Sequence, residues 1–148
     1  MKKFLLIFIF LLSECGYQPI YISKNLSDIE FFKITLEGDA DINRKVVGSL
    51  SFKENNLQDS LNSLLIKSSY KIIETSKSSK GQVESYKSQI ILNFIITDGN
   101  EVVNSKNFSK EFSYNIKDNK FELIRYQNEV KDNLINKIVE DIILYMNI

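Results

Sequence analysis

The amino-acid sequence predicts one α+β domain, in which an antiparallel sheet of about four strands carries two helices packed on one face, in the order β-α-β-β-β-α. Residues 61–116 alternate between apolar and polar side chains, as antiparallel strands do. The C-terminal 25 or so residues instead repeat apolar side chains every three or four positions, as an amphipathic helix does. Strands in succession with helices on one face make an α+β sandwich.

The first predicted strand is the short apolar stretch 31–36 (FFKITL), which ends before Gly38. Asp39 or Asp41 can then cap a helix, because a short acidic side chain accepts hydrogen bonds from free N–H groups of the first turn. Apolar residues at i, i+4 and i+8 predict that this helix covers about 40–53. Gly48 either weakens it or lets it approach a neighbour closely. Residues 54–60 are predicted to form a loop.

Three long strands are predicted next, over 61–75, 83–97 and 101–116, although 57–67 also fits a helix. The turn between the last two contains Asp98-Gly99, a strong hairpin signal. Ile91 and Ile95 lie opposite the main apolar face of their strand, which predicts a central strand covered on both sides. The third strand has one polar face, which favours an antiparallel sheet covered on one face. Its apolar face is predicted to contain Val102, Phe108, Phe112, Tyr114 and Ile116.

The last element is predicted to be a helix over about 121–146, beginning near Asp118 or Asn119. It is long enough to lie across the whole sheet, and its apolar face is expected to be core. The residues of this face are Leu123, Tyr126, Val130, Leu134, Ile138, Ile142 and Tyr145.

Composition argues against catalysis and nucleic-acid binding. The chain has no histidine, the commonest general base and metal ligand. Without residues 1–14 it carries 17 basic and 18 acidic side chains, so no basic field favours nucleic acid. The acidic pairs Asp39/Asp41 and Glu140/Asp141 are more simply a helix cap and solvated helix charges. We therefore expect no enzyme, cofactor or metal site.

The N-terminus predicts export. Two lysines precede the unbroken apolar stretch 4–12 (FLLIFIFLL), which is the build of a signal peptide. Nine apolar residues are too few to span a bilayer, which takes roughly 20. The predicted organisation is a lipoprotein signal peptide over 1–14, an acylated tether over 15–28 and a domain over 29–148.

Cys15 is the predicted lipidation site. A leucine three positions before it and a small residue at Ser13 resemble a bacterial lipobox, in which the cysteine receives acyl chains. Several acyl chains hold a protein on a membrane far better than one. Glu14 departs from the small residue usual before the cysteine, and an exported protein with a free thiol stays open as an alternative. Gly16, rather than Asp, is compatible with delivery to the outer membrane.

The residues after the leader resemble a known family. The segment CGYQPIY (15–21), the long hairpin 61–97 and the strand-to-helix passage SYNIKD (113–118) are similar to the LPS-assembly lipoproteins of the LptE family, over essentially the whole chain. The resemblance implies a lipid-anchored protein at the periplasmic face of the outer membrane. It also implies that the chain plugs and helps to assemble an LptD-like β-barrel for lipopolysaccharide transport. A periplasmic lipid-carrying lipoprotein of a lipid-transport ABC system is the alternative.

Four lysines flank the tip of the long hairpin and are candidate contacts for lipopolysaccharide, whose phosphates and acidic sugars are anionic. The competing interpretation is a solubilising sheet edge, since lysine also guards edges against aggregation. These residues are Lys71, Lys77, Lys80 and Lys87.

Overall fold

The computed structural model describes residues 29–57 and 61–146. The predicted signal peptide 1–14, the tether 15–28 and Cys15 lie outside the described residues. The described part has the elements β1 (Glu30–Phe31), β2 (Ile34–Gly38), α2 (Ala40–Leu50), β3 (Lys53–Glu54), β4 (Ser63–Lys77), β5 (Val83–Asp98), β6 (Glu101–Asn115) and α3 (Lys120–Met146).

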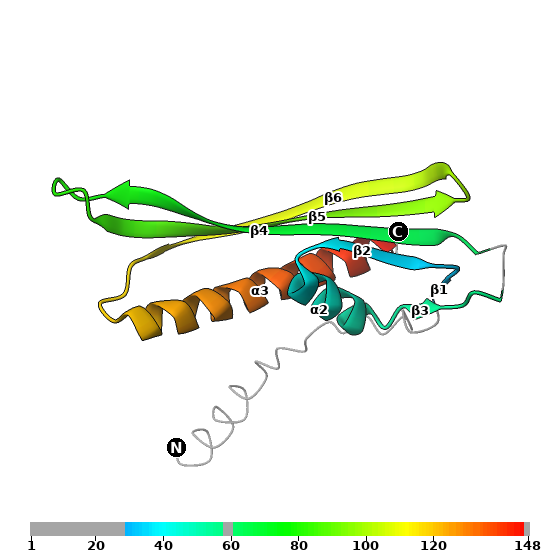
Figure 1. Ribbon diagram of the computed structural model, residues 1–148, viewed down its shortest axis with the longest axis horizontal. Helices are drawn as coiled ribbons and strands as arrows, with labels where there is room; N and C mark the ends of the chain where they lie inside the picture. The colour runs from blue at the N-terminus through cyan, green and yellow to red at the C-terminus, as the bar shows by residue number, and fades with distance from the viewer. Residues whose placement is uncertain (1–28, 58–60, 147–148) are drawn as a thin grey trace, which may run out of the picture.

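Four strands form the main sheet in the order β2-β4-β5-β6 (Figure 1). Strands β4, β5 and β6 are antiparallel, as predicted. Strand β2 pairs with β4 in parallel, so the sheet is mixed rather than wholly antiparallel. The reason is the intervening helix α2, which returns the chain to the end of the sheet where it started, and two parallel strands need such a crossover.

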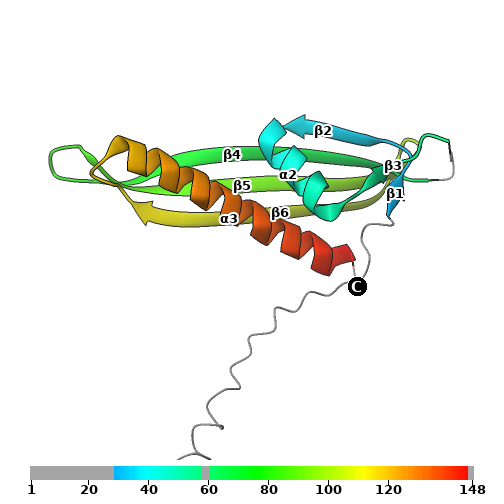
Figure 2. The same cartoon turned by 90° about the horizontal axis from the view of Figure 1, so that it is seen from below.

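Both helices lie on the same face of the sheet, which confirms the predicted fold class (Figures 1 and 2). Helix α3 crosses the sheet obliquely beneath β5 and β6, and α2 lies beside it under β2 and β4 (Figure 2). No described helix lies on the opposite face. The prediction that β5 is covered on both sides is therefore wrong for the described part of the chain, and Ile91 and Ile95 are partly exposed there.

The core fills the space between the two helices and the sheet. Side chains of even number on β4 and β5 point into it, as the alternation predicted. All seven residues of the predicted α3 face are buried or half-buried. The most deeply buried side chains are Ile42, Val46, Leu50, Leu64, Ile66, Ile90, Leu92, Phe94, Ile135, Ile138 and Ile142.

The predicted first strand divides in two. Residues 30–31 pair with β3 and residues 34–38 pair with β4. Phe31 is buried against Phe52, with ring centroids 5.2 Å apart. Helix α2 ends earlier than predicted because Ser51 adopts a left-handed backbone with φ 54°. Residues 53–54 form β3, so the loop that was predicted to begin at residue 54 begins one residue later.

A bulge shifts the beginning of β6. Ile96 pairs with Asn104, but the next residue, Thr97, pairs with Val102, so Val103 is the extra residue. Val102 therefore lies on the opposite face from Phe108, and the prediction that the two share a face is wrong.

Both predicted helix caps are confirmed. Asp39 Oδ1 accepts hydrogen bonds of 3.0 Å from the N–H groups of Asp41 and Ile42. Asn119 Oδ1 accepts one of 2.8 Å from the N–H of Phe121. Neither α2 nor α3 is both long and apolar enough to cross a membrane, among the residues that are described.

Candidate functional site

The face of the sheet away from the helices, here called the outer face, is the largest candidate interaction surface. The strand register arranges its side chains in rows across the sheet. Ser63, Thr97 and Val102 form the row nearest β1. The next two rows are Thr35, Leu65, Ile95, Ser105 and then Glu37, Lys67, Asn93, Asn107; the following three are Ser69, Ile91, Ser109, then Lys71, Gln89, Glu111, and then Ile73, Lys87, Ser113.

Most polar groups of the outer face are tied to a neighbour on the next strand. Lys67 Nζ lies 3.2 Å from Glu37 Oε2, and Asn107 Nδ2 donates to Asn93 Oδ1 at 2.5 Å. Glu111 binds Lys87 at 3.2 Å and accepts a hydrogen bond from Gln89. Such cross-strand pairs stabilise the sheet and fix the direction of the donors and acceptors on this face.

Three aliphatic side chains lie among these polar residues, on the two central strands β4 and β5. Leu65 and Ile95 are direct neighbours in the register, and Ile91 lies two rows further along. All three are partly exposed. Apolar side chains bordered by polar ones are usual in a protein–protein interface.

The structure separates the four predicted lysines. Lys71 and Lys87 lie on the outer face in adjacent rows, and Lys87 is paired with Glu111. Lys77 binds Glu74 at 2.9 Å, which raises the Lys77 pKa, and Lys80 is exposed in the hairpin turn. The fold thus brings Lys71 and Lys87 close together, whereas Lys77 and Lys87 are each in an ion pair with a glutamate.

A notch lies between the free edge of β6 and helix α3, and no pattern in the sequence predicted it. Its volume is about 420 Å³. Phe112, Val130 and Leu134 supply its apolar lining, whereas Glu129 and Lys137 are among its polar residues. Contacts of β6 with α3 lie on either side of Phe112 in the sequence, through Tyr114–Tyr126 and Lys110–Asp141.

Helix α2 is tied to α3 by a cluster of charges centred on Lys131. Its ammonium group lies 3.2 Å from Asp39 Oδ2, 3.1 Å from Asp41 Oδ2, and 5.2 Å from the centre of the Tyr70 ring. Lys45 extends the cluster to Asp132 at 2.6 Å, and its pKa is raised by that hydrogen bond.

The two carboxylates of this cluster have lowered pKa values. Partial burial raises the pKa of Asp39, but the hydrogen bonds from the Ile42 N–H and from Lys131 outweigh it. The hydrogen bond with Lys131 is the largest influence on Asp41 and lowers its pKa. The folded state therefore binds fewer protons than the unfolded state at acidic pH. The lowered pKa values of Asp39 and Asp41 stabilise the folded state. This contribution is complete above the ordinary carboxyl pKa and is lost as the pH falls through the lowered pKa values.

We expect Lys131→Met to lower the free energy of unfolding by roughly 1–2 kcal/mol at pH 7, because two partly buried carboxylates lose a charged hydrogen-bond donor. The difference between variant and wild type should shrink at pH 3. Urea unfolding at both pH values measures this. Lys137→Met, at an exposed position of the same helix, is the matched control and should change little. An equal loss at both pH values for Lys131→Met would contradict the role of the carboxylates.

Within 29–57 and 61–146, no group of three or more histidine, cysteine, aspartate or glutamate side chains could hold a metal ion. Of the two acidic pairs, the first contains the predicted cap, whereas one member of the second is in an ion pair and is not simply a solvated charge. Asp39 is a cap, and Asp141 makes an ion pair with Lys110 on the neighbouring strand at 2.7 Å.

No family model matches the sequence, and no curated protein matches it. Solved structures do share its fold. Rare lipoprotein B from Shewanella oneidensis aligns with a TM-score of 0.60 at 14% identity, covering 78% of this chain and 93% of that one. A minor lipoprotein from Acinetobacter baumannii aligns at 0.54 and 15% identity, covering 77% and 89%.

This chain has the rare lipoprotein B fold. A Helicobacter pylori protein described as a putative neuraminyllactose-binding hemagglutinin homolog also shares it, with a TM-score of 0.52, 11% identity and coverage of 88% and 87%. At these identities the likeness concerns the fold alone. The shared fold is a sheet with two helices on one face. A fold does not determine function, which depends on the chain's own surfaces.

Proposed function

We propose that this chain is a lipid-anchored lipoprotein at the periplasmic face of the outer membrane that plugs and helps to assemble an LptD-like β-barrel for lipopolysaccharide transport. It acts through its shape and surfaces, without catalysis and without a cofactor. The anchor is the acylated Cys15. The observation that carries the proposal is the outer face, a long and regular surface that no described helix covers (Figure 1).

The size of the outer face suits a stable protein interface. Strand β5 has 16 residues, which at about 3.3 Å each gives a length of roughly 53 Å. The three long strands β4, β5 and β6, each about 4.8 Å wide, then give an area of roughly 750 Å². A stable interface of ordinary size takes about 800 Å² from each partner.

The chemistry of the outer face suits a polar protein wall better than lipid. Its rows contain hydroxyl and amide groups beside two cross-strand ion pairs, and its charges nearly cancel. The inside of an outer-membrane barrel is polar, whereas the outside presents an apolar band to lipid. Leu65, Ile91 and Ile95 on the central strands supply apolar area that loses its water on contact.

A pull-down from mild detergent extracts tests this function. The wild-type chain should recover an outer-membrane barrel in an amount equal to its own, molecule for molecule. Ile91→Glu puts a charge at the centre of the outer face, and we expect barrel recovery to fall at least about tenfold, because burying an unpaired charge at an interface is costly. Leu144→Glu is the control, since Leu144 is 55% exposed on α3, which lies on the opposite face of the sheet.

Recovery that is lost with Leu144→Glu and kept with Ile91→Glu would show that the helix side contacts the barrel. Recovery of no barrel by the wild type would contradict the function itself. Circular dichroism of both variants shows whether each keeps its fold.

The notch favours the second candidate function, a periplasmic lipid-carrying lipoprotein of a lipid-transport ABC system. Its volume falls in the range of small-molecule sites, and Phe112, Val130 and Leu134 provide an apolar lining. Phospholipid that copurifies with the wild-type chain, in the absence of a barrel, would support this function over the first.

A further inference from the structure

Three exposed aliphatic side chains lie at one end of the sheet. This end, here called the β1 end, comprises β1, β3, residues 55–57 and the β5–β6 turn with the beginning of β6 (Figure 1). Leu57 is 98% exposed, Val102 62% and Val103 59%. Exposed apolar side chains at one end of a domain make that end a candidate surface for contact with a partner or a membrane.

Local structure holds these side chains outward. The N–H of Leu57 donates to Asn55 Oδ1, and Asn55 itself is held by Phe31 O at 2.8 Å and by Glu30 Oε2 at 2.7 Å. Val103 is the extra residue of the β6 bulge. Bulges reorient side chains at the ends of sheets, so the backbone at the bulge explains why Val102 and Val103 are exposed.

The chain that leads back to Cys15 joins the body at this same end. Ile29 is the first described residue, and its carbonyl accepts a hydrogen bond from the N–H of Lys53 on β3. The 14 residues of 15–28 span at most about 50 Å when fully extended. The sheet itself is roughly 53 Å long. The hairpin end could reach the acylated residue only if nearly all of this segment ran back along the sheet.

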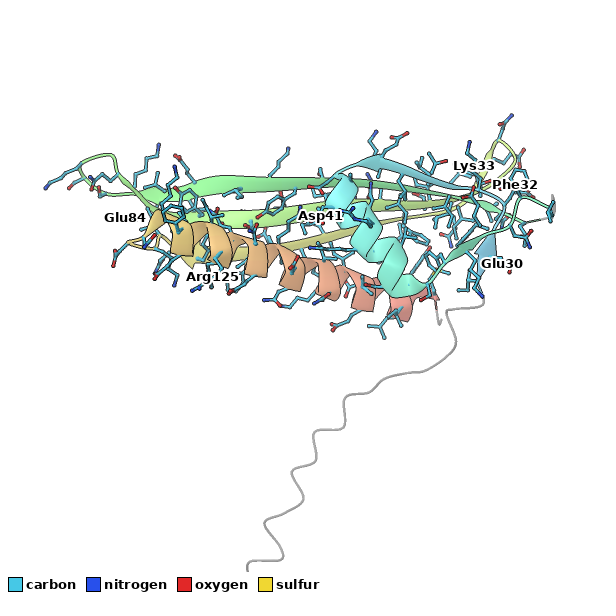
Figure 3. All side chains as sticks on the ribbon, turned by 60° about the horizontal axis from the view of Figure 1, so that its bottom comes forward. Glu30, Phe32, Lys33, Asp41, Glu84 and Arg125 are labelled. Carbon is cyan, nitrogen blue, oxygen red and sulfur yellow. The ribbon has the colours of Figure 1, made fainter. Side chains whose placement is uncertain are left out.

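Charge distinguishes the two ends. The β1 end has four acidic residues (Glu30, Glu54, Asp98, Glu101) and two lysines (Lys33, Lys53). The hairpin end carries five lysines (71, 77, 80, 117 and 120) and four acidic residues (Glu74, Glu84, Asp118 and Glu122), so its balance is one positive charge against two negative charges at the β1 end. Phe121, which is 83% exposed, lies at the hairpin end as well. Figure 3 shows Glu30 and Lys33 at one end and Glu84 and Arg125 at the other. An anionic surface would attract the hairpin end, so contact of the β1 end with lipid must rely on apolar insertion.

We propose that the β1 end rests on the lipid leaflet that holds the anchor, with Leu57, Val102 and Val103 inserted among the headgroups. The proposal rests on the acylated Cys15 of the proposed function. It orients the molecule, because it directs the β4–β5 hairpin away from the leaflet and leaves the outer face beyond the Val102 row free for the barrel.

The absence of tryptophan in the chain makes a direct test possible. Three full-length variants each carry one tryptophan: Leu57→Trp, Val102→Trp and, at the opposite end, Phe121→Trp. The acylated chains are reconstituted into vesicles of zwitterionic phosphatidylcholine with bromine atoms on the acyl chains near the headgroups. Bromine quenches only tryptophan that enters the leaflet. Flotation and mass spectrometry of the N-terminal peptide report the anchor separately.

We expect at least about twofold stronger quenching for Leu57→Trp and Val102→Trp than for Phe121→Trp, and little change between low and high salt, since salt screens charge attraction and not apolar insertion. Equal or stronger quenching of Phe121→Trp would overturn the proposal. So would vesicles that float with the chain but quench none of the three variants. A chain without acyl groups that does not float would remove the anchor of the proposed function, and this orientation with it.

Discussion

Gly38→Ala is expected to destabilise the fold by about 3 kcal/mol or more, because a new side chain there meets main chain that cannot yield. Gly38 has φ +90°, a conformation that L-residues rarely adopt. A Cβ built on it would lie 1.8 Å from Ser68 O and 2.9 Å from Ser68 C. These atoms belong to the parallel partner strand, to which Gly38 itself is paired.

Relief of this clash would dismantle the junction between β2 and α2. The next residue, Asp39, donates its N–H to Ser68 O at 3.2 Å, and the hydroxyl of Ser68 donates to Asp39 O at 3.2 Å. Asn43 Nδ2 holds the end of β2 by donating to Glu37 O at 2.8 Å. A displaced β2 would break these bonds and move the Asp39 cap away from Lys131.

Urea unfolding measures the effect, and Gly48→Ala is the matched control. Gly48 lies inside α2, and a Cβ there would meet nothing within 4 Å. Alanine should therefore stabilise the helix by about 0.5–1 kcal/mol. Of the two predictions for Gly48, close approach to a neighbour is wrong, and the cost to the helix stays a prediction that this variant tests. Similar effects of the two substitutions would contradict the steric account of Gly38.

The elements that the sequence predicted well are those with a sustained period. The alternation over 83–97 and the three-and-four spacing over 121–146 each extend for four or more repeats, and the structure has β5 and α3 there. Two-residue strands such as β1 and β3 have no period to detect, and they form because Phe31 and Phe52 pack together.

Pairing partners and surfaces were harder to predict, because they depend on residues far apart in the chain. The parallel pairing of β2 with β4 could have been inferred from the helix between them. The alternation of apolar and polar residues alone does not show whether two strands run parallel or antiparallel. Lys131 reaches Asp39 across 92 positions, a contact that no local pattern encodes. Ile91 and Ile95 looked like core because an apolar residue on a central strand usually is, whereas here they form part of the outer face.

Phe94→Ala is expected to lower the free energy of unfolding by about 3–5 kcal/mol, because truncating a buried aromatic ring leaves a cavity in addition to the lost burial. Phe94 is 1% exposed on the central strand β5. Its ring centroid lies 6.2 Å from that of Phe52 and 6.5 Å from that of Phe108. Such a loss is a large part of the 5–15 kcal/mol that holds an ordinary domain together.

The Phe94 ring connects the packing around β1 and β3 with the packing between β6 and α3. Its removal should therefore destabilise both regions. Phe52 packs on Phe31 of β1, and on the other side Phe108 of β6 packs edge-on against Tyr145 of α3 at 5.8 Å. The chain of rings thus links the segment nearest the predicted anchor to the last turns of α3. We expect Phe94→Ala to lower the melting temperature by roughly 10–20 °C in a calorimetric scan.

Phe121→Ala removes a ring of the same kind from a site that is 83% exposed, and it should change the free energy of unfolding by less than about 0.5 kcal/mol. A comparable loss in both variants would mean that ring burial does not set the stability of the domain. A large loss for Phe94→Ala alone places the stability of the domain in the aromatic chain between sheet and helices. The outer face then remains free to bind a partner, because its side chains are not the ones that hold the fold.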